Sequence, residues 1–195
     1  MTMNASEIIS QITRHIPLDE RESLYFSSLL IHAKIKQGDY VEKIGTVTKN
    51  FIHVESGCLM SYATDKGGDD HVIQFSTTGW WTGDLQSITK ALPAIYSTRA
   101  LTESTVFYLP KTDMDVLLER YPKFEKYFRI LFQNALITQA DRIVQNNSST
   151  AEDRYEQFRI KYPSLEQYVP LKYIASYLGI TPEFLSKIRR RQAKR

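Results

Sequence analysis

LKYIASYLGITPEFLSKIRR, residues Leu171–Arg190, is the most informative stretch of this 195-residue chain. Ile174, Ala175 and Leu178 would share one face of a first helix, and the small Ala175 would let a second helix cross closely. Gly179 follows where this helix would end, and glycine readily takes the positive φ of a helix C-terminus. These residues predict a helix that closes in a tight turn.

A second helix would begin at Thr181, whose hydroxyl can cap its N-terminus. Pro182 suits the first helical position, and Glu183 is favourable near the positive end of the helix dipole. Leu185 and Ile188 would face back onto the first helix. The pattern predicts a helix-turn-helix, with an ordinary pair of packed helices as the plainer alternative.

The exposed residues of this motif are predicted DNA contacts. In a helix-turn-helix, the N-terminal residues of the second helix face base edges in the major groove, where Glu can accept from cytosine and Lys can donate to guanine. The predicted base contacts are Thr181, Pro182, Glu183, Ser186 and Lys187. The predicted phosphate contacts are Arg189, Arg190, Arg191, Lys172 and Tyr173.

The charge of the chain, +3 in total, is unevenly distributed. Residues 1–147 carry 15 basic and 17 acidic side chains, and residues 148–195 carry 10 basic and 5 acidic ones. Six of the last nine residues are basic, and such a block is typical of a nucleic-acid contact, although a solvated tail is the alternative. We therefore predict two domains, 1–147 and 148–195, with NNSST at 146–150 as the linker.

The first 110 residues predict helices followed by strands. Residues 4–31 have helical apolar spacing interrupted by Pro17. From Lys34 to Pro110, short β-prone runs alternate with Gly, Asp and Asn, and DKGGDD at 65–70 is a predicted hairpin turn. Several strands at this spacing predict a compact antiparallel barrel or jelly roll.

A long helix is predicted over about residues 121–147, because this segment lacks Gly and internal Pro. It carries two apolar stripes. They consist of Phe124, Phe128, Leu131, Ala135 and Thr138, and of Ile130, Ile137 and Val144. Apolar groups on two sides indicate contact with two surfaces, so either a dimer interface or packing on the barrel could use them.

Together these features resemble the Crp/Fnr superfamily of bacterial transcription regulators, and most closely its subgroup common in Bacteroidetes. The similarity is carried by KIKQGDYV, FIHVESGCLMSYATDKGGDDHVIQF, TGDLQSI, TRALTESTVFYLP and the C-terminal motif. It implies an α+β fold: an N-terminal double-stranded β-helix of the cyclic-nucleotide-binding type (a jelly roll), a long dimerisation helix and a C-terminal helix-turn-helix domain. It also implies a cytoplasmic homodimer that binds palindromic double-stranded DNA.

The resemblance also points to an effector pocket in the barrel. Gly83, Asp84 and Leu85 stand where effector-binding members carry Gly-Glu-Leu, and Arg99 is a further candidate. Ala94 and Ile95 occupy the place of the Arg-Ser pair that holds a cyclic phosphate, so we expect no cyclic AMP binding. The family's β-hairpin wing has no room before Arg195, and the basic tail could partly replace its phosphate contacts.

Two other classes of function remain open. A cupin-like, metal-dependent enzyme needs clustered histidines, but His15, His32, His53 and His71 are scattered, so no metal, cofactor or catalytic residue is predicted. A protein-interaction module with a vestigial DNA-binding domain is the third hypothesis. No apolar run is long enough for a membrane span, and the single Cys58 is interpreted as a buried structural thiol.

Overall fold

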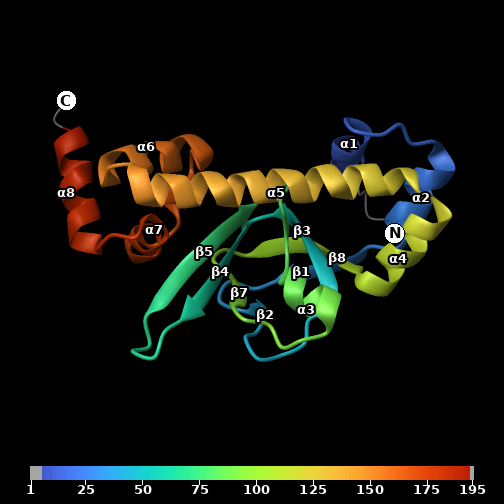
Figure 1. Cartoon of the computed structure of the whole chain (residues 1–195), viewed down its shortest axis with the longest axis horizontal. Coiled ribbons are helices and arrows are strands. Elements are labelled where there is room, and N and C mark those ends of the chain that lie inside the picture. Colours follow the sequence, from blue (N-terminus) through green and yellow to red (C-terminus); the bar gives the residue numbers. More distant parts are fainter. Residues whose placement is uncertain (1–5, 194–195) are drawn as a thin grey trace. The chain divides into compact units, whose positions relative to one another are not determined.

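The computed structural model describes residues 6–193 (Figure 1). Their contacts divide the chain into two compact units. The first contains the residues up to Ser61 together with Phe75–Gln133, and the second contains Tyr62–Gln74 and the residues from Asn134 on. Among the described residues, no helix has both the length and the apolar character of a membrane span.

The N-terminal helices of the first unit are α1, Ser6–Thr13, and α2, Glu20–Ser28. Asp19 caps α2: its Oδ1 accepts a hydrogen bond from the Glu22 N–H at 2.8 Å, and the Glu22 carboxylate accepts one from the Asp19 N–H at 2.9 Å. The predicted interruption of the helical segment around Pro17 is therefore confirmed, because α2 starts from its own cap.

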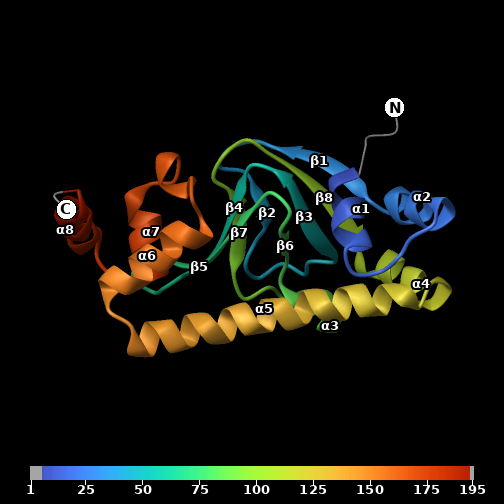
Figure 2. The same ribbon diagram turned by 90° about the horizontal axis from the view of Figure 1, so that it is seen from above.

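Within residues 6–193, eight strands form two four-stranded sheets (Figure 2). The first sheet has the order β1 (Ile31–Ile35), β8 (Ser104–Pro110), β3 (Asn50–Ser56) and β6 (Trp81–Thr82). The second has the order β2 (Tyr40–Glu42), β7 (Ser97–Ala100), β4 (Cys58–Thr64) and β5 (Asp70–Thr77). This antiparallel sandwich confirms the predicted jelly-roll fold.

Apolar side chains from both sheets fill the interior of the sandwich. The core cluster consists of Ile52, Val54, Leu59, Ala100 and Val106. Val54 and Val106 face each other across the antiparallel β3–β8 pair, where two β-branched side chains pack well. β3 and β4 are buried over four and five consecutive residues, so the core extends along both strands.

A second core joins the barrel to helices α3 (Leu85–Lys90), α4 (Lys111–Arg120) and the first half of α5 (Lys123–Ser148). Phe124 stacks on Phe26 of α2 with 5.5 Å between ring centroids, and Phe128 is almost fully buried. Trp81 donates an indole hydrogen bond of 3.0 Å to the Tyr127 hydroxyl. At its N-terminal end, the first apolar stripe of the long helix therefore packs on the protein's own core.

The second unit contains the end of α5 and four further helical segments. They are α6 (Ala151–Lys161), the 3-10 turn η1 (Leu165–Gln167), α7 (Leu171–Leu178) and α8 (Pro182–Gln192). The predicted linker at 146–150 is wrong, since α5 continues to Ser148 and Thr150 caps α6 by accepting from the Asp153 N–H at 3.2 Å. The functional division at residue 147 stays a prediction.

The outer half of the β4–β5 hairpin also belongs to the second unit. Residues 65–71 are called the hairpin tip below. Its turn is ordered by Asp65, whose Oδ1 accepts hydrogen bonds from the N–H groups of Gly67 and Asp69. Asp65 Oδ2 lies 2.8 Å from His71 Nε2, and this contact is the main reason that the pKa of Asp65 is lowered. The predicted hairpin turn is confirmed.

Candidate nucleic-acid interface

The turn between α7 and α8 has the geometry of a helix-turn-helix. Gly179 ends α7 with φ 66° and ψ 37°, in the left-handed region that favours glycine. The N–H of Ile180 closes the helix end on the Ala175 carbonyl at 3.0 Å. Thr181 caps α8 by accepting a hydrogen bond of 3.2 Å from the Phe184 N–H, and Pro182 takes the first helical position. The predicted roles of Gly179, Thr181 and Pro182 in the turn are confirmed.

A compact core holds α7 and α8 against α6. Ala175, Leu185 and Ile188 are fully buried, and Ile174 and Leu178 nearly so. The rings of Phe158, Tyr162 and Tyr177 complete this core, with centroid separations of 5.2–5.9 Å. Because these side chains fix the two helices, the outer face of α8 is presented on a rigid support.

Eight of the predicted DNA contacts lie on α8 or at its N-cap, and Lys172 and Tyr173 lie on α7. The exposed residues are Thr181, Glu183, Lys187, Arg189, Arg190, Arg191 and Lys172, and the half-buried ones are Pro182, Ser186 and Tyr173. Phe184 was missed, although it is 39% exposed in the first turn of α8. The sequence does indicate its exposure, because Phe184 stands one residue before Leu185 and therefore points away from the buried face of Leu185 and Ile188.

The basic side chains of α8 differ in their partners. Arg189 Nε lies 3.9 Å and Arg159 Nε lies 3.5 Å from the Glu166 carboxylate, which also accepts a hydrogen bond from Tyr155. Arg191 lies 3.7 Å from Glu152. Within residues 6–193, by contrast, no carboxylate forms an ion pair with Lys187 or Arg190. Lys194 and Arg195 of the predicted basic tail lie outside the described residues.

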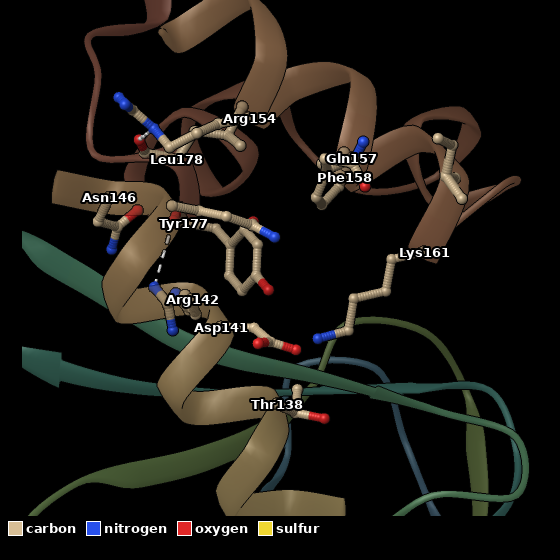
Figure 3. Close-up of a pocket in the computed structure, with 12 residues that line it drawn as sticks. Thr138, Asp141, Arg142, Asn146, Arg154, Gln157, Phe158, Lys161, Tyr177 and Leu178 are labelled. Atoms are coloured by element: carbon tan, nitrogen blue, oxygen red, sulfur yellow. Dashed lines mark hydrogen bonds between the residues drawn. The ribbon is translucent and has the colours of Figure 1, made fainter. Parts of the chain in front are cut away.

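The C-terminal end of α7 is held by two arginines (Figure 3). Arg142 of α5 donates to the Tyr177 carbonyl at 3.1 Å, and its guanidinium lies 4.2 Å from the centroid of the Tyr177 ring. Arg154 of α6 donates to the Leu178 carbonyl at 3.1 Å. Cations at a helix C-terminus complement its dipole, so both side chains stabilise the first helix of the motif. A cavity of about 220 Å³ opens beside them between α5 and α6.

The hairpin docks on the same helix. The Ser176 hydroxyl donates to the Asp70 carbonyl at 2.8 Å and accepts from the Val72 N–H at 2.9 Å. Arg142 also donates to the carbonyls of Val72 and Ile73. A cleft of about 740 Å³ lies between hairpin residues 68–71 and the α7–α8 turn. Five of the predicted DNA contacts line this cleft. They are Lys172, Tyr173, Thr181, Pro182 and Glu183.

The candidate effector residues lie in the first unit. Asp84 is 1% exposed and caps α3: its Oδ1 accepts from the Ser87 N–H at 3.0 Å and its Oδ2 from the Ile95 N–H at 2.8 Å. Gly83 precedes it, Leu85 is the first residue of α3, and Arg99 lies on β7 opposite Tyr40 of β2. The structure thus brings Gly83, Asp84 and Leu85 together and places Arg99 on a separate strand. Their role in effector binding stays a prediction.

Buried polar groups occupy the barrel interior near Asp84. The Thr98 hydroxyl donates to Glu42 Oε2 at 3.2 Å and lies 2.9 Å from the Ser61 hydroxyl. Burial raises the pKa of Glu42. A cavity of about 400 Å³, lined by residues 40–43 and 46–50, opens on the barrel beside Glu42, and none of the four candidate effector residues lines it.

Cys58 and His53 both lie in the buried interior of the protein. Cys58 is fully buried, which raises the pKa of its thiol to about 12 and confirms the predicted burial. His53 is also fully buried, and burial lowers its pKa to about 4. Within the part of the chain that the structure describes, no three His, Cys, Asp or Glu side chains lie together as metal ligands would.

Comparisons with known proteins agree with this architecture. Residues 32–121 match the family described as cyclic nucleotide-binding domain. FixK2 from Bradyrhizobium japonicum has a TM-score of 0.74 at 13% identity, with 85% of each chain covered. A transcriptional regulator of the Crp/Fnr family from Eubacterium rectale has a TM-score of 0.68 at 17% identity, covering 91% of this chain and 85% of its own.

The Thermus thermophilus Catabolite Activator Protein has a TM-score of 0.58 at 19% identity, covering 94% of this chain and 87% of its own. In the sequence comparison with curated proteins, none matches the chain. The predicted resemblance to Crp/Fnr regulators is confirmed for the domain and the fold, whereas the Bacteroidetes subgroup stays a prediction.

Proposed function

Because residues 32–121 match the cyclic nucleotide-binding domain family and the chain shares its fold with Crp/Fnr regulators, we propose that this protein is a homodimeric, DNA-binding transcription regulator. The observation that carries the proposal is the α7–α8 turn, whose buried core presents a polar and basic outer face. The protein then acts by binding, without catalysis, and works in the cytoplasm.

The outer face of α8 suits the major groove. Glu183 and Lys187 are exposed and can bond a cytosine amino group and guanine acceptors, and Phe184 adds an apolar surface for a thymine methyl group. Arg190 is available for a phosphate as it stands. Arg189 and Arg191 would exchange ion pairs of 3.9 and 3.7 Å for phosphate contacts, and such long pairs near the surface contribute little stability.

The second half of α5 supports a homodimer. Its exposed apolar side chains are Leu136 (71%), Ile137 (58%), Ile143 (62%) and Val144 (61%). Residues 136 and 143, and residues 137 and 144, are seven apart, so the four side chains form one stripe of the kind that pairs helices. Pairing along this stripe would present two recognition helices to DNA, and half-sites about one helical turn apart would then be read together.

The barrel is not expected to bind cyclic AMP. At the place where the resemblance puts the phosphate-binding Arg-Ser pair, Ala94 is buried and Ile95 is 57% exposed. The Asp84 carboxylate is already engaged with two backbone N–H groups. Without a charge-assisted phosphate contact, most of the affinity for a cyclic phosphate is lost. Any effector is therefore a small molecule of another class.

Gel-shift titrations at two salt concentrations test the DNA-binding assignment. Lys187→Ala should weaken binding to a site selected from random duplex DNA more than binding to a scrambled sequence, because Lys187 is assigned to a base. Arg190→Ala should weaken both and reduce the salt slope by about 1, because a phosphate contact is lost. Lys126→Ala, which removes an exposed lysine of α5, is the matched control.

If Lys187→Ala lowered the affinity for both DNAs equally, the assignment of Lys187 to a base would be wrong. A wild-type protein without salt-dependent DNA affinity would favour instead an interaction module whose DNA-binding half is vestigial.

A further inference from the structure

We infer that the hairpin tip, residues 65–71, is an autoinhibitory element that blocks the approach of DNA to the α7–α8 turn and has to leave before DNA binds. The inference rests on the proposed function. Its starting point is the cleft between hairpin residues 68–71 and the predicted DNA contacts of α7 and α8. A segment with no assigned role in reading DNA thus lies against the reading surface.

The docking of the hairpin uses specific bonds to α7. The Ser176 hydroxyl donates to the Asp70 carbonyl and accepts from the Val72 N–H, as a neighbouring strand would do. β5 is the edge strand of its sheet, and this hydroxyl bonds two of its backbone groups. The Ser176 side chain of α7 therefore holds the hairpin in place.

Arg142 reinforces the same contact. It donates to the carbonyls of Val72 and Ile73 in β5 and to the carbonyl of Tyr177 at the end of α7. The guanidinium thus ties the hairpin backbone and α7 to one residue of α5, and Figure 3 shows its bond to Tyr177. Because α5 carries the predicted dimer stripe, a change in α5 would act on the hairpin and the motif together.

The charge of the hairpin tip opposes DNA. It contains three carboxylates, Asp65, Asp69 and Asp70, against Lys66 and His71, and His71 contacts Asp65. Asp69 and Asp70 belong to residues 68–71, which face Lys172 and Thr181–Glu183 across the cleft. A phosphate that approaches Lys172 would meet like charge at short range, which is unfavourable. The docked hairpin therefore lowers DNA affinity by its position and by its charge.

A simpler role for the contact makes a different prediction. If α7 only covered the outer edge of β5, breaking the contact would loosen the hairpin and leave DNA affinity unchanged or weaker. If the hairpin tip inhibits, breaking the contact strengthens DNA binding. The sign of the change in affinity therefore separates the two roles.

The test uses the full chain and fluorescein-labelled duplex DNA of random sequence, titrated by fluorescence anisotropy. Ser176→Ala removes both hydrogen bonds without changing charge, and we expect it to lower the Kd about tenfold. Asp69→Asn removes one exposed charge of the hairpin tip and should lower the Kd about twofold at low salt. Ser148→Ala and Glu119→Gln are the matched controls and should bind like wild type.

Hydrogen exchange at the Val72 amide reports on the contact itself. In the wild-type protein this amide should be protected without DNA and exchange faster when DNA saturates the protein. It should exchange faster in Ser176→Ala even without DNA. Continued protection of Val72 at saturating DNA would overturn the inference.

The affinities separate the inference from the proposed function. If wild type binds DNA and Ser176→Ala binds equally well or more weakly, the inhibitory role is wrong and the proposed function stands. If neither the wild-type protein nor any variant binds DNA, the proposed function is wrong, and the inhibitory role fails with it.

Discussion

Replacing Gly179 by alanine tests the turn on which the helix-turn-helix depends. Gly179 has φ 66° and ψ 37°, a conformation that costs an alanine about 1–2 kcal/mol. A Cβ at this position would meet no heavy atom within 4 Å, so no steric clash is added. Removing a glycine also restricts the unfolded chain, which returns about 0.4–1 kcal/mol. We therefore expect a net loss of about 1 kcal/mol in the stability of the motif.

Hydrogen exchange of peptides from α7 and α8, measured by mass spectrometry, should show this loss as about fivefold faster exchange. Gly179→Asn should lie between alanine and wild type, because asparagine tolerates the left-handed conformation better. Trp80 and Trp81 both lie in the first unit, so their fluorescence in urea titrations follows the barrel separately.

Gly57→Ala provides the contrast. Gly57 also has a positive φ of 91°, but a Cβ there would lie 2.3 Å from Ser104 Oγ and 2.6 Å from the Glu103 carbonyl oxygen. The loss of stability in Gly57→Ala should be clearly larger than that in Gly179→Ala, since backbone atoms must move. Unchanged exchange in Gly179→Ala, or a loss as large as that of Gly57→Ala, would refute the reasoning about the turn.

Two further predictions concern assembly and pH. Ile137→Asp places a charge in the exposed stripe of α5 and should convert a dimer to a monomer in sedimentation analysis, whereas Leu24→Asp, at an exposed leucine of α2, should not; a wild-type monomer would contradict the dimer. Burial lowers the pKa of His53 from 6.5 to about 4. Burial of the neutral ring therefore contributes fully to the stability of the fold above pH 6.5, and this contribution of about 3 kcal/mol is lost as pH falls through 4. His53→Gln should flatten that dependence in urea titrations and His15→Gln should not, and equal pH profiles for wild type and His53→Gln would show that burial of the imidazole is not responsible.

The turn could be predicted from the sequence because its determinants are local. Gly179, Thr181 and Pro182 each act on the backbone within one or two residues, so their order alone is informative. The apolar faces of α7 and α8 follow from helical spacing in the same way. Phe184 was missed because an apolar residue was not expected on the outer face.

The docked hairpin could not be predicted. Ser176 and Val72 are 104 residues apart, and the contact joins a hydroxyl to backbone groups, which leave no pattern in the sequence. Arg142 likewise appears in the sequence as one of many helical cations. Asp84 is a different case. An Asp before a helix is a local signal for an N-cap, but the cap was not predicted because the resemblance assigned Asp84 to effector binding.

The linker predicted at 146–150 differs from the structure for a further reason. Asn and Ser favour turns, and NNSST therefore indicated a linker. In the structure the last turn of α5 includes Asn146, Asn147 and Ser148, and the Ser148 hydroxyl donates to the Val144 carbonyl at 2.7 Å. Thr150 then starts α6, so the two helices meet in a tight corner.

Selection of the wild-type protein on a pool of random duplex DNA, followed by sequencing, tests the central claim most directly. A homodimer with two recognition helices should enrich a palindromic site whose half-sites are about 10 base pairs apart, or a multiple of this spacing. Lys187→Ala should lose the preference at one or two positions of each half-site. A pool that stays random after repeated rounds at moderate salt would contradict sequence-specific DNA binding.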